Sequence, residues 1–367
     1  MQMDDAGKKP KYELVDMGVT GEDAVRTAFA NQVAYCEANG APITARVCAA
    51  IMAAVESDQQ GALLERVRRW QGAPLADALP LRLAGAIHAL QLAGEVPELA
   101  PIYRGVPADD AAIIAEVISG YEAQLMRWLD GPPQTNEAGR SSNFIAALLW
   151  LADRGLPARF ECLEIGSSAG INLMIDRYRY DLGGVLVGPD EAAMRFAPEW
   201  KGPPPPDHAF AFVSLKGCDV APVDLTDPPQ ALRLKAYIWP EHTIRFERME
   251  AAIAAAKQRA PDLVKMNAAD FVEAELAKPQ APGTTRVLMH SIVWQYVPED
   301  QQARVIAAME AAGARATPDA PLAWMALEAN RTVHRHELRV RFWPGGEEEV
   351  LLARAHAHGA DIEWKAG

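Results

Sequence analysis

Few cysteines, no surplus of positive charge and no long apolar run characterise this sequence of 367 residues. The four cysteines are far apart and form no C-x-x-C pair, so we expect buried side chains rather than a zinc knuckle or a disulfide framework. They are Cys36, Cys48, Cys162 and Cys218. The 36 lysines and arginines against 49 aspartates and glutamates leave a net charge of −13. We therefore predict no nucleic-acid partner, because such a surface cannot neutralise phosphates.

Membrane and secretion signals are also missing. The longest apolar run, residues 144–152, is about half of the roughly 18 residues that a membrane span needs. The first residues, Met1-Gln2-Met3-Asp4-Asp5, are acidic and lack the apolar core of a secretory signal. These features predict a cytoplasmic protein with no membrane partner.

The first part of the chain has a helical pattern. Apolar residues recur at helical spacing, as in the set Val25, Phe29, Val33 and Cys36, with no alternating β-type run. Glycine and proline breakers divide this part into five or six segments. We predict an N-terminal tail at residues 1–19 and an all-α domain at residues 20–156.

After Pro157 short strand-like runs alternate with helical runs, which is typical of a parallel sheet covered by helices. The expected strands are 159–165, 210–215, 263–267, 286–292 and 322–327, and the expected helices are 170–178, 241–258 and 298–312. Strands 336–343 and 349–355 predict a closing antiparallel hairpin. The fold class is α/β, with a Rossmann-like, mostly parallel sheet at residues 157–367. The long connection before residue 210 predicts an insertion at about 183–209 that contains four consecutive prolines.

A glycine-rich loop, Gly166-Ser167-Ser168-Ala169-Gly170, joins the first expected strand to the first expected helix. In such a loop the backbone and the helix N-terminus can approach a ligand closely. A nicotinamide-dinucleotide loop is disfavoured because Ile171 occupies its third glycine position. A methyltransferase-type loop, acid-x-G-x-G-x-G, fits from Glu164 onwards with one change of glycine to serine.

The same loop also reads G-x-S-x-G, the nucleophile elbow of serine hydrolases, with Ser168 as the nucleophile. Downstream acid and base candidates exist in Asp270, His290 and His334. A hydrolase, however, places several strands before its elbow. A tight turn without any ligand is a further interpretation that stays open.

Several segments together resemble a bacterial family that carries only a domain-of-unknown-function label and is grouped by fold with methyltransferases. They are 134–140, 163–173, 217–224, 237–240 with Arg245 and Arg248, and 290–295. The resemblance spans most of the chain. It implies a fold that resembles S-adenosylmethionine-dependent methyltransferases and S-adenosylmethionine as the cofactor, but it implies no reaction or substrate.

In methyltransferase-like folds, the acid that ends the first strand lies near the methionine part of the cofactor, which implies that role for Glu164. The acid after the second strand, here Asp219, would hold the ribose hydroxyls, and Asp270 would lie beside the adenine. The set expected to bind the cofactor is Glu164, Gly166, Ser167, Ser168, Gly170, Asp219 and Asp270. Turn and helix-capping roles are the open alternatives for Asp219 and Asp270.

We expect the acceptor to be a small molecule that lies between the two domains. His290 ends the fourth strand and is the candidate base, with a structural histidine as the alternative. The residues expected to face the acceptor are Asn136, Glu137, Arg140, Ser291, Trp294 and Gln295; for Glu137 and Arg140 the alternative is an exposed ion pair. Two H-x-H pairs, at 334/336 and 356/358, lack a convincingly spaced third ligand, so no metal is expected. A non-catalytic binding protein is the alternative from another class.

Overall fold

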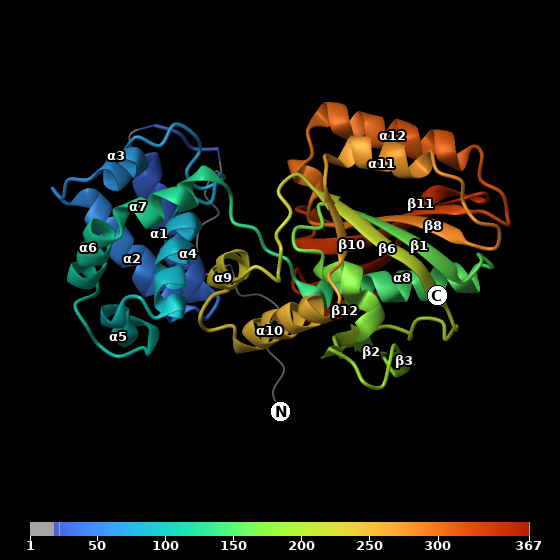
Figure 1. Ribbon diagram of the computed structural model, residues 1–367, viewed down its shortest axis with the longest axis horizontal. Coiled ribbons are helices and arrows are strands. Elements are labelled where there is room, and N and C mark those ends of the chain that lie inside the picture. Colours follow the sequence, from blue (N-terminus) through green and yellow to red (C-terminus); the bar gives the residue numbers. More distant parts are fainter. Residues whose placement is uncertain (1–17, 22, 367) are drawn as a thin grey trace. The chain divides into compact units, whose positions relative to one another are not determined.

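A computed structural model describes residues 18–21 and 23–366 (Figure 1). Most of the predicted tail and its acidic start lie outside the described residues. Contacts divide the chain into two compact units. Unit 1 holds residues up to 135 together with 228–247, and unit 2 holds 136–227 and 248–367. The predicted division at residues 156 and 157 stays a prediction.

The elements of unit 1 in the described part of the chain are helices. They are α1 (Ala24–Ala38), α2 (Pro42–Glu56), α3 (Ala62–Arg68), α4 (Leu79–Ala93), η1 (Pro97–Leu99), α5 (Ala100–Tyr103), α6 (Asp110–Gly120), α7 (Glu122–Met126), η2 (Arg127–Asp130) and α9 (Pro228–Ala236), with the start of α10 (Thr243–Gln258). The breakers act as expected: Pro42 begins α2, and Gly94 ends α4 with a φ of +72°. Phe29, Ile51 and Ile87 lie in its fully buried core.

Unit 2 is built on a sheet of nine strands in the order β5-β12-β11-β10-β9-β8-β1-β6-β7. The strands are β1 (Arg159–Ile165), β5 (Glu199–Lys201), β6 (Ala211–Asp219), β7 (Asp262–Lys265), β8 (Thr285–Ser291), β9 (Leu322–Asn330), β10 (Arg335–Trp343), β11 (Gly346–Ala355) and β12 (Asp361–Trp364). All pairs from β7 to β9 are parallel, whereas β9, β10, β11 and β12 pair antiparallel. The five predicted parallel strands and the hairpin are therefore confirmed.

The insertion is also confirmed, but its structure was not predicted. A separate small sheet is formed by β2 (Tyr178–Leu182), which directly precedes the insertion, and by β3 (Val185–Val187) and β4 (Met194–Phe196) within it. The predicted helix at 170–178 is wrong in type, because the chain forms a 3-10 helix, η4 (Ile171–Arg177), and then enters β2. The alternation of Tyr178, Tyr180 and Leu182 with polar residues explains why the helix ends there.

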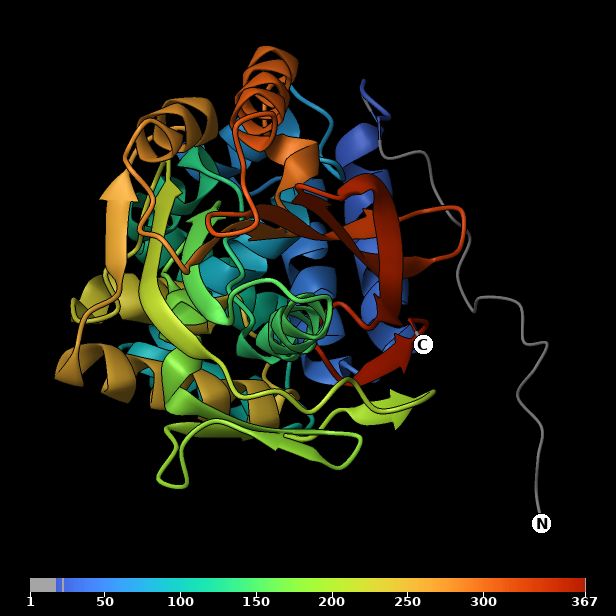
Figure 2. The same cartoon turned by 90° about the vertical axis from the view of Figure 1, so that its right-hand side faces the viewer.

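Helices cover both faces of the large sheet of unit 2 (Figure 2). On one face lie α11 (Ala268–Leu276) and α12 (Glu299–Gly313), and the sheet curls around α8 (Ser141–Asp153) on the other. Two further 3-10 helices, η3 (Ala138–Arg140) and η5 (Trp294–Tyr296), complete the unit. Leu163 and Ile165 of β1 pack against Phe271 of α11 and Met309 of α12. We call these two sides of the sheet the α12 face and the α8 face.

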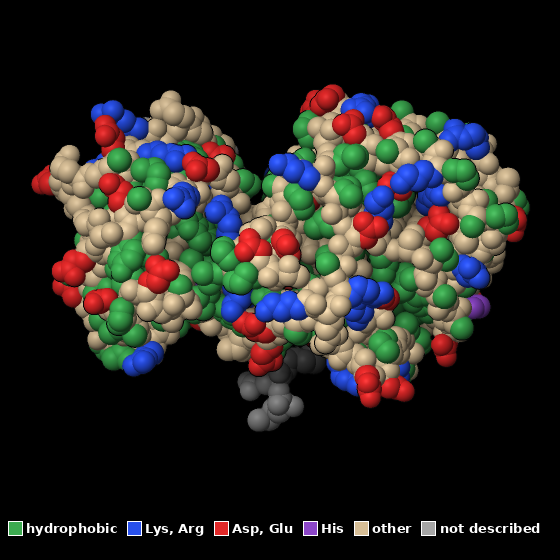
Figure 3. Space-filling model, viewed as in Figure 1, with side chains coloured by type: hydrophobic (Ala, Val, Ile, Leu, Met, Phe, Trp, Pro, Cys, Tyr) green, Lys and Arg blue, Asp and Glu red, His purple; other side chains and the backbone are tan. Residues whose placement is uncertain are grey.

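Surface and core agree with the composition. All four cysteines are buried free thiols, as expected. On the side drawn in Figure 3, lysines and arginines are interspersed with aspartates and glutamates. In the described part of the chain, no helix has the length and apolar character needed to cross a membrane.

Candidate functional site

The strand order of unit 2 reverses at β1. Numbered among themselves in chain order, the five parallel strands lie in the order 3-2-1-4-5, with β6 on one side of β1 and β8 on the other. Ligands of open α/β sheets bind beyond the carboxyl ends of the strands at such a reversal. The glycine-rich loop follows β1 at this position. Glu164 alternates with Leu163 and Ile165 and therefore faces the α8 side.

Two glycines of this loop are required by packing. Gly166 has a φ of +67°, and a Cβ there would lie 2.1 Å from Cγ2 of Val293. Gly170 has a φ of +69°, and its Cβ would lie 2.9 Å from the Pro261 ring. A larger residue would therefore clash with the protein itself, so these glycines alone do not indicate a ligand.

Ser168 is held in a conformation that residues with a side chain rarely adopt, with a φ of +53°. Its N–H donates to Oδ2 of Asp219 at 2.8 Å, and its carbonyl accepts from the N–H of Val223 at 3.0 Å. The segment after β6 thus fixes the loop from both sides. Backbone strain of this kind persists where surrounding contacts enforce it, and it is common at functional sites.

Three buried polar atoms around the loop have no hydrogen-bond partner: Oε2 of Glu164, Oγ of Ser168 and Oδ1 of Asn172. Asn172 is on η4, and its Nδ2 donates to the other carboxyl oxygen of Glu164 at 2.8 Å. Glu164 is 2% exposed, Ser168 7% and Asn172 1%. Since buried polar groups are nearly always paired with protein or with ordered water, these three atoms mark a place where a polar group can bind. Two of them are acceptors, so a group that donates hydrogen bonds would satisfy them.

The carboxyl group of Glu164 is unusually weakly acidic. Burial raises its pKa to about 7, although hydrogen bonds from Asn172 and Ser167 and the charge of Arg140 act in the opposite direction. The negative charge of Asp219 adds to the rise. A shifted pKa in a buried, half-satisfied carboxyl group is typical of binding and catalytic sites.

Comparison with known proteins gives one match. The model of the DUF2332 family, described as "Uncharacterized protein conserved in bacteria", matches residues 26–364. The chain belongs to the DUF2332 family. No curated protein and no solved structure matches it.

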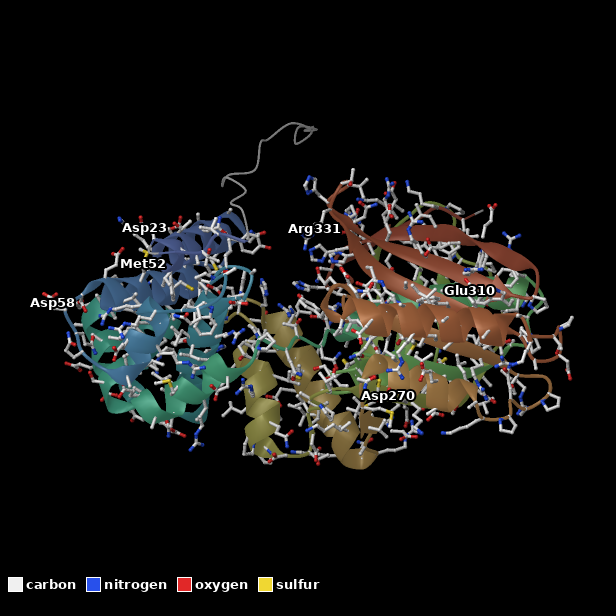
Figure 4. All side chains as sticks on the ribbon, turned by 90° about the horizontal axis from the view of Figure 1, so that it is seen from above. Asp23, Met52, Asp58, Asp270, Glu310 and Arg331 are labelled. Carbon is white, nitrogen blue, oxygen red and sulfur yellow. The ribbon has the colours of Figure 1, made fainter. Side chains whose placement is uncertain are left out.

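Of the residues expected to bind a cofactor in this DUF2332 chain, the structure groups all but one around the loop. Asp219 lies beside it, and its two carboxyl oxygens accept the N–H groups of Ser168 and Ala221, each at 2.8 Å. Asp270 instead lies on the exposed side of α11 (Figure 4), where it contacts Arg304 and Asn267. Asp270 does not cap α11. The N-cap is Asn267, whose side-chain oxygen accepts the backbone N–H of Asp270 at 2.9 Å.

The segment of residues 136–140, which was expected to face the acceptor, is built into unit 2. Oδ1 of Asn136 accepts the first N–H of η4, from Ile171, at 2.9 Å, so Asn136 supports the glycine loop directly. Glu137 and Arg140 are 4% and 6% exposed, which contradicts the alternative of an exposed ion pair. Glu137 pairs with Arg248 at 3.4 Å.

His290 faces the opposite side of the sheet from Glu164. Leu288 of β8 packs toward α11 and α12. His290 is two residues later on the same strand, so its side chain points to the same face as that of Leu288. Its Nδ1 lies 2.7 Å from Oε1 of Glu328, and its Nε2 accepts the indole N–H of Trp324 at 2.9 Å. Both ring nitrogens are therefore engaged, and the role of His290 as a base stays a prediction.

The remaining predicted residues follow His290 along the chain. Ser291 ends β8 and is buried, and Trp294 stacks on the imidazole with ring centroids 5.2 Å apart. Gln295 is exposed and accepts from Arg331 at 3.4 Å. Within the described residues no three histidine, cysteine, aspartate or glutamate side chains are grouped so as to hold a metal ion.

Sequence reasoning missed three residues that complete these arrangements: Asn172, Val293 and Glu328. Asn172 occupies the second position after the loop, where an amide can turn back toward the end of β1. Glu328 was not recognised because its partner His290 lies 38 residues earlier. Residues that lie side by side on adjacent parallel strands have no fixed separation in the sequence, so a single sequence does not reveal that they are in contact.

Proposed function

We propose that this chain is an S-adenosylmethionine-dependent methyltransferase that acts on a small molecule. The observation that carries the proposal is the group of three unpartnered buried atoms on Glu164, Ser168 and Asn172 at the reversal of strand order. The order of the parallel strands and the closing antiparallel strands support it further, since the same layout is typical of Rossmann-like methyltransferases.

The residues around the loop fit such a cofactor in chemical type. Glu164 and Asn172 offer acceptors to the ammonium group of the methionine part. Asp219 is half-buried and already holds two backbone N–H groups, but each carboxyl oxygen can accept a second hydrogen bond, as from a ribose hydroxyl. The bound cofactor would supply a methyl group on a positively charged sulfur. The chain's own contribution is alignment and exclusion of water, so a base such as His290 is not required.

Calorimetric titration with S-adenosylhomocysteine tests the proposal. We expect micromolar binding that Glu164→Gln weakens at least tenfold, because the ammonium group loses its charged acceptor. 5′-Methylthioadenosine lacks the amino-acid part, so its affinity should change less than twofold in the same variant. Asp58→Asn, an exposed site in unit 1, is the matched control and should leave both affinities unchanged. Absence of binding to the folded protein would overturn the proposal.

The serine hydrolase is the second candidate, favoured by the strained backbone and unpartnered Oγ of Ser168. Its weakness is that no histidine contacts this hydroxyl among the described residues. A fluorophosphonate probe that labels the protein, with labelling lost in Ser168→Ala, would establish the hydrolase. We expect no labelling, and binding of S-adenosylhomocysteine to Ser168→Ala within about fivefold of the unmodified chain.

A further inference from the structure

A pocket of about 630 Å³ lies on the α12 face of unit 2, and its lining includes no residue of the glycine loop. We call it the tryptophan pocket. Its lining comes mainly from β9, β10 and α12, with single residues of β8, η5 and β11, and includes Trp294, Trp324, Ala326 and Ile306. The volume is within the range of small-molecule sites, roughly 300 to 1,000 Å³.

The aromatic wall of the pocket is fixed in place. Trp294 stacks on His290 with an interplanar angle of 23°, and Trp324 meets Trp294 edge-on with centroids 5.6 Å apart. The indole N–H of Trp324 is bonded to His290, which is itself bonded to Glu328. Glu328 also accepts the N–H groups at positions 293 and 294, at 3.1 and 3.3 Å. Both indoles are half-buried, so the wall presents rigid aromatic surface to the pocket.

Most charged side chains at the rim of the pocket are matched with one another, whereas Arg331 donates to the amide oxygen of Gln295. Arg341 pairs with Glu310 of α12, which Figure 4 labels. Arg339 pairs with Glu337 at 2.8 Å and with Glu349 at 3.1 Å. A ligand with a net charge would have to compete with these pairs or lie beside a charge of its own sign, whereas an uncharged ligand leaves them intact.

We propose that the tryptophan pocket binds an uncharged, planar aromatic small molecule against Trp294 and Trp324. The site is independent of the proposed cofactor site, because Glu164 and His290 face opposite sides of the sheet. Apolar contact with Ile306 and Ala326 completes the surroundings of the ring.

Two fluorescent probes with the same ring system test this proposal: N-phenyl-1-naphthylamine, which is uncharged, and 8-anilinonaphthalene-1-sulfonate, which carries a negative charge. We expect the uncharged probe to bind once per chain at micromolar concentration and the sulfonate to bind at least tenfold more weakly. Equal affinity for both probes, or no binding of the uncharged probe, would overturn the proposal.

Variants locate the probe. Ala326→Phe places a ring inside the pocket and should weaken the binding of the uncharged probe at least tenfold. Ala311→Phe puts the same side chain at an exposed position of α12 that points away from the lining, and should change the affinity less than twofold. Ile306→Glu is a second variant at a 43% exposed position, where folding tolerates the change, and should also weaken the probe. Binding that neither Ala326→Phe nor Ile306→Glu alters would contradict the assignment.

Discussion

Glu164 combines burial, one unpartnered oxygen and a pKa of about 7, far above the ordinary 4.5 of a glutamate. Because the folded protein holds this proton more tightly than the unfolded chain, the contribution of Glu164 to stability falls as pH rises from about 4.5 to about 7. Above that range the folded state contains a buried charge with incomplete hydrogen bonding. The same property makes Glu164 suited to receive a cationic group.

Glu164→Gln should therefore stabilise the protein in a pH-dependent way. We expect the variant to exceed the unmodified chain in free energy of unfolding by about 2 to 3 kcal/mol at pH 8 and by less than about 1 kcal/mol at pH 5. Urea unfolding at the two pH values measures the difference. An effect of the same size at both values would show that Glu164 does not titrate between them, and Asp58→Asn provides the baseline.

At the scale of elements, the glycine loop depends on close contact between the end of β1 and the segment after β8. Gly166→Ala combines a left-handed backbone with a Cβ 2.1 Å from Val293, and should cost about 3 kcal/mol. Gly155 has a similar φ, +85°, but a Cβ at this position would meet open space. Gly155→Ala should therefore lower the free energy of unfolding by about 1 kcal/mol. Thermal unfolding of both variants compares them. Equal losses would mean that backbone conformation alone, and not Val293, determines the requirement for glycine at 166.

Elements with strong local patterns were predictable from the sequence, and those defined by distant partners were not. The central strands, including β1 and β8, are short segments with apolar residues at their centres and breakers near their ends, so their positions could be predicted closely. The hairpin of β2 and β3 had a signal that was overlooked, since Gly183-Gly184 stands between two short β-like runs. β5 and β12 are three and four residues long and pair with each other across the sequence, so no local signal identifies them.

Candidate site residues follow the same rule. Glu164, Ser168 and Asp219 were found because each lies at or just after the end of a predictable strand. Their actual partners were not found, because Asn172 reaches Glu164 only through the 3-10 turn that replaced a predicted α-helix. The side of the sheet that His290 faces could not be predicted either, because side chains alternate between the two faces and an error of one residue in the position of the strand reverses the face.

At the scale of the whole molecule, each of the two compact units is built from two separate stretches of the chain. Residues 228–247 belong to unit 1, although the residues before and after them belong to unit 2. In unit 1, α9 packs on α4, and Leu234, Tyr237 and Ile238 are buried. A Cβ on Gly85 of α4 would lie 2.7 Å from the Tyr237 ring, which shows how close this contact is. Unit 2 therefore does not correspond to one continuous piece of chain.

A fragment of residues 136–367 should therefore self-associate, since it exposes the apolar side of 228–247. We expect aggregates in size-exclusion chromatography with light scattering. The same fragment with Leu234→Glu and Ile238→Glu should be mostly monomeric, because the changes remove exposed apolar surface. A monomeric unmodified fragment would contradict this division of the chain.

Charge gives a second prediction at this scale. The net charge of −13 should prevent binding of nucleic acid at physiological salt. Fluorescence anisotropy with a labelled DNA duplex and a labelled RNA strand should show no change up to tens of micromolar protein. Salt-dependent binding in the low micromolar range would disprove the exclusion.

The most direct measurement for the proposed site is the number of protons released when S-adenosylhomocysteine binds, obtained by calorimetry in buffers of different ionisation enthalpy. Because burial raises the pKa of Glu164 to about 7, binding of an ammonium group at pH 7 should release a fraction of a proton per site, and a clearly smaller fraction at pH 8.5. Glu164→Gln should bind weakly and release none at either pH. Tight binding with the same proton release in Glu164→Gln, or no binding at all, would contradict the assignment of Glu164 as the residue that receives the ligand.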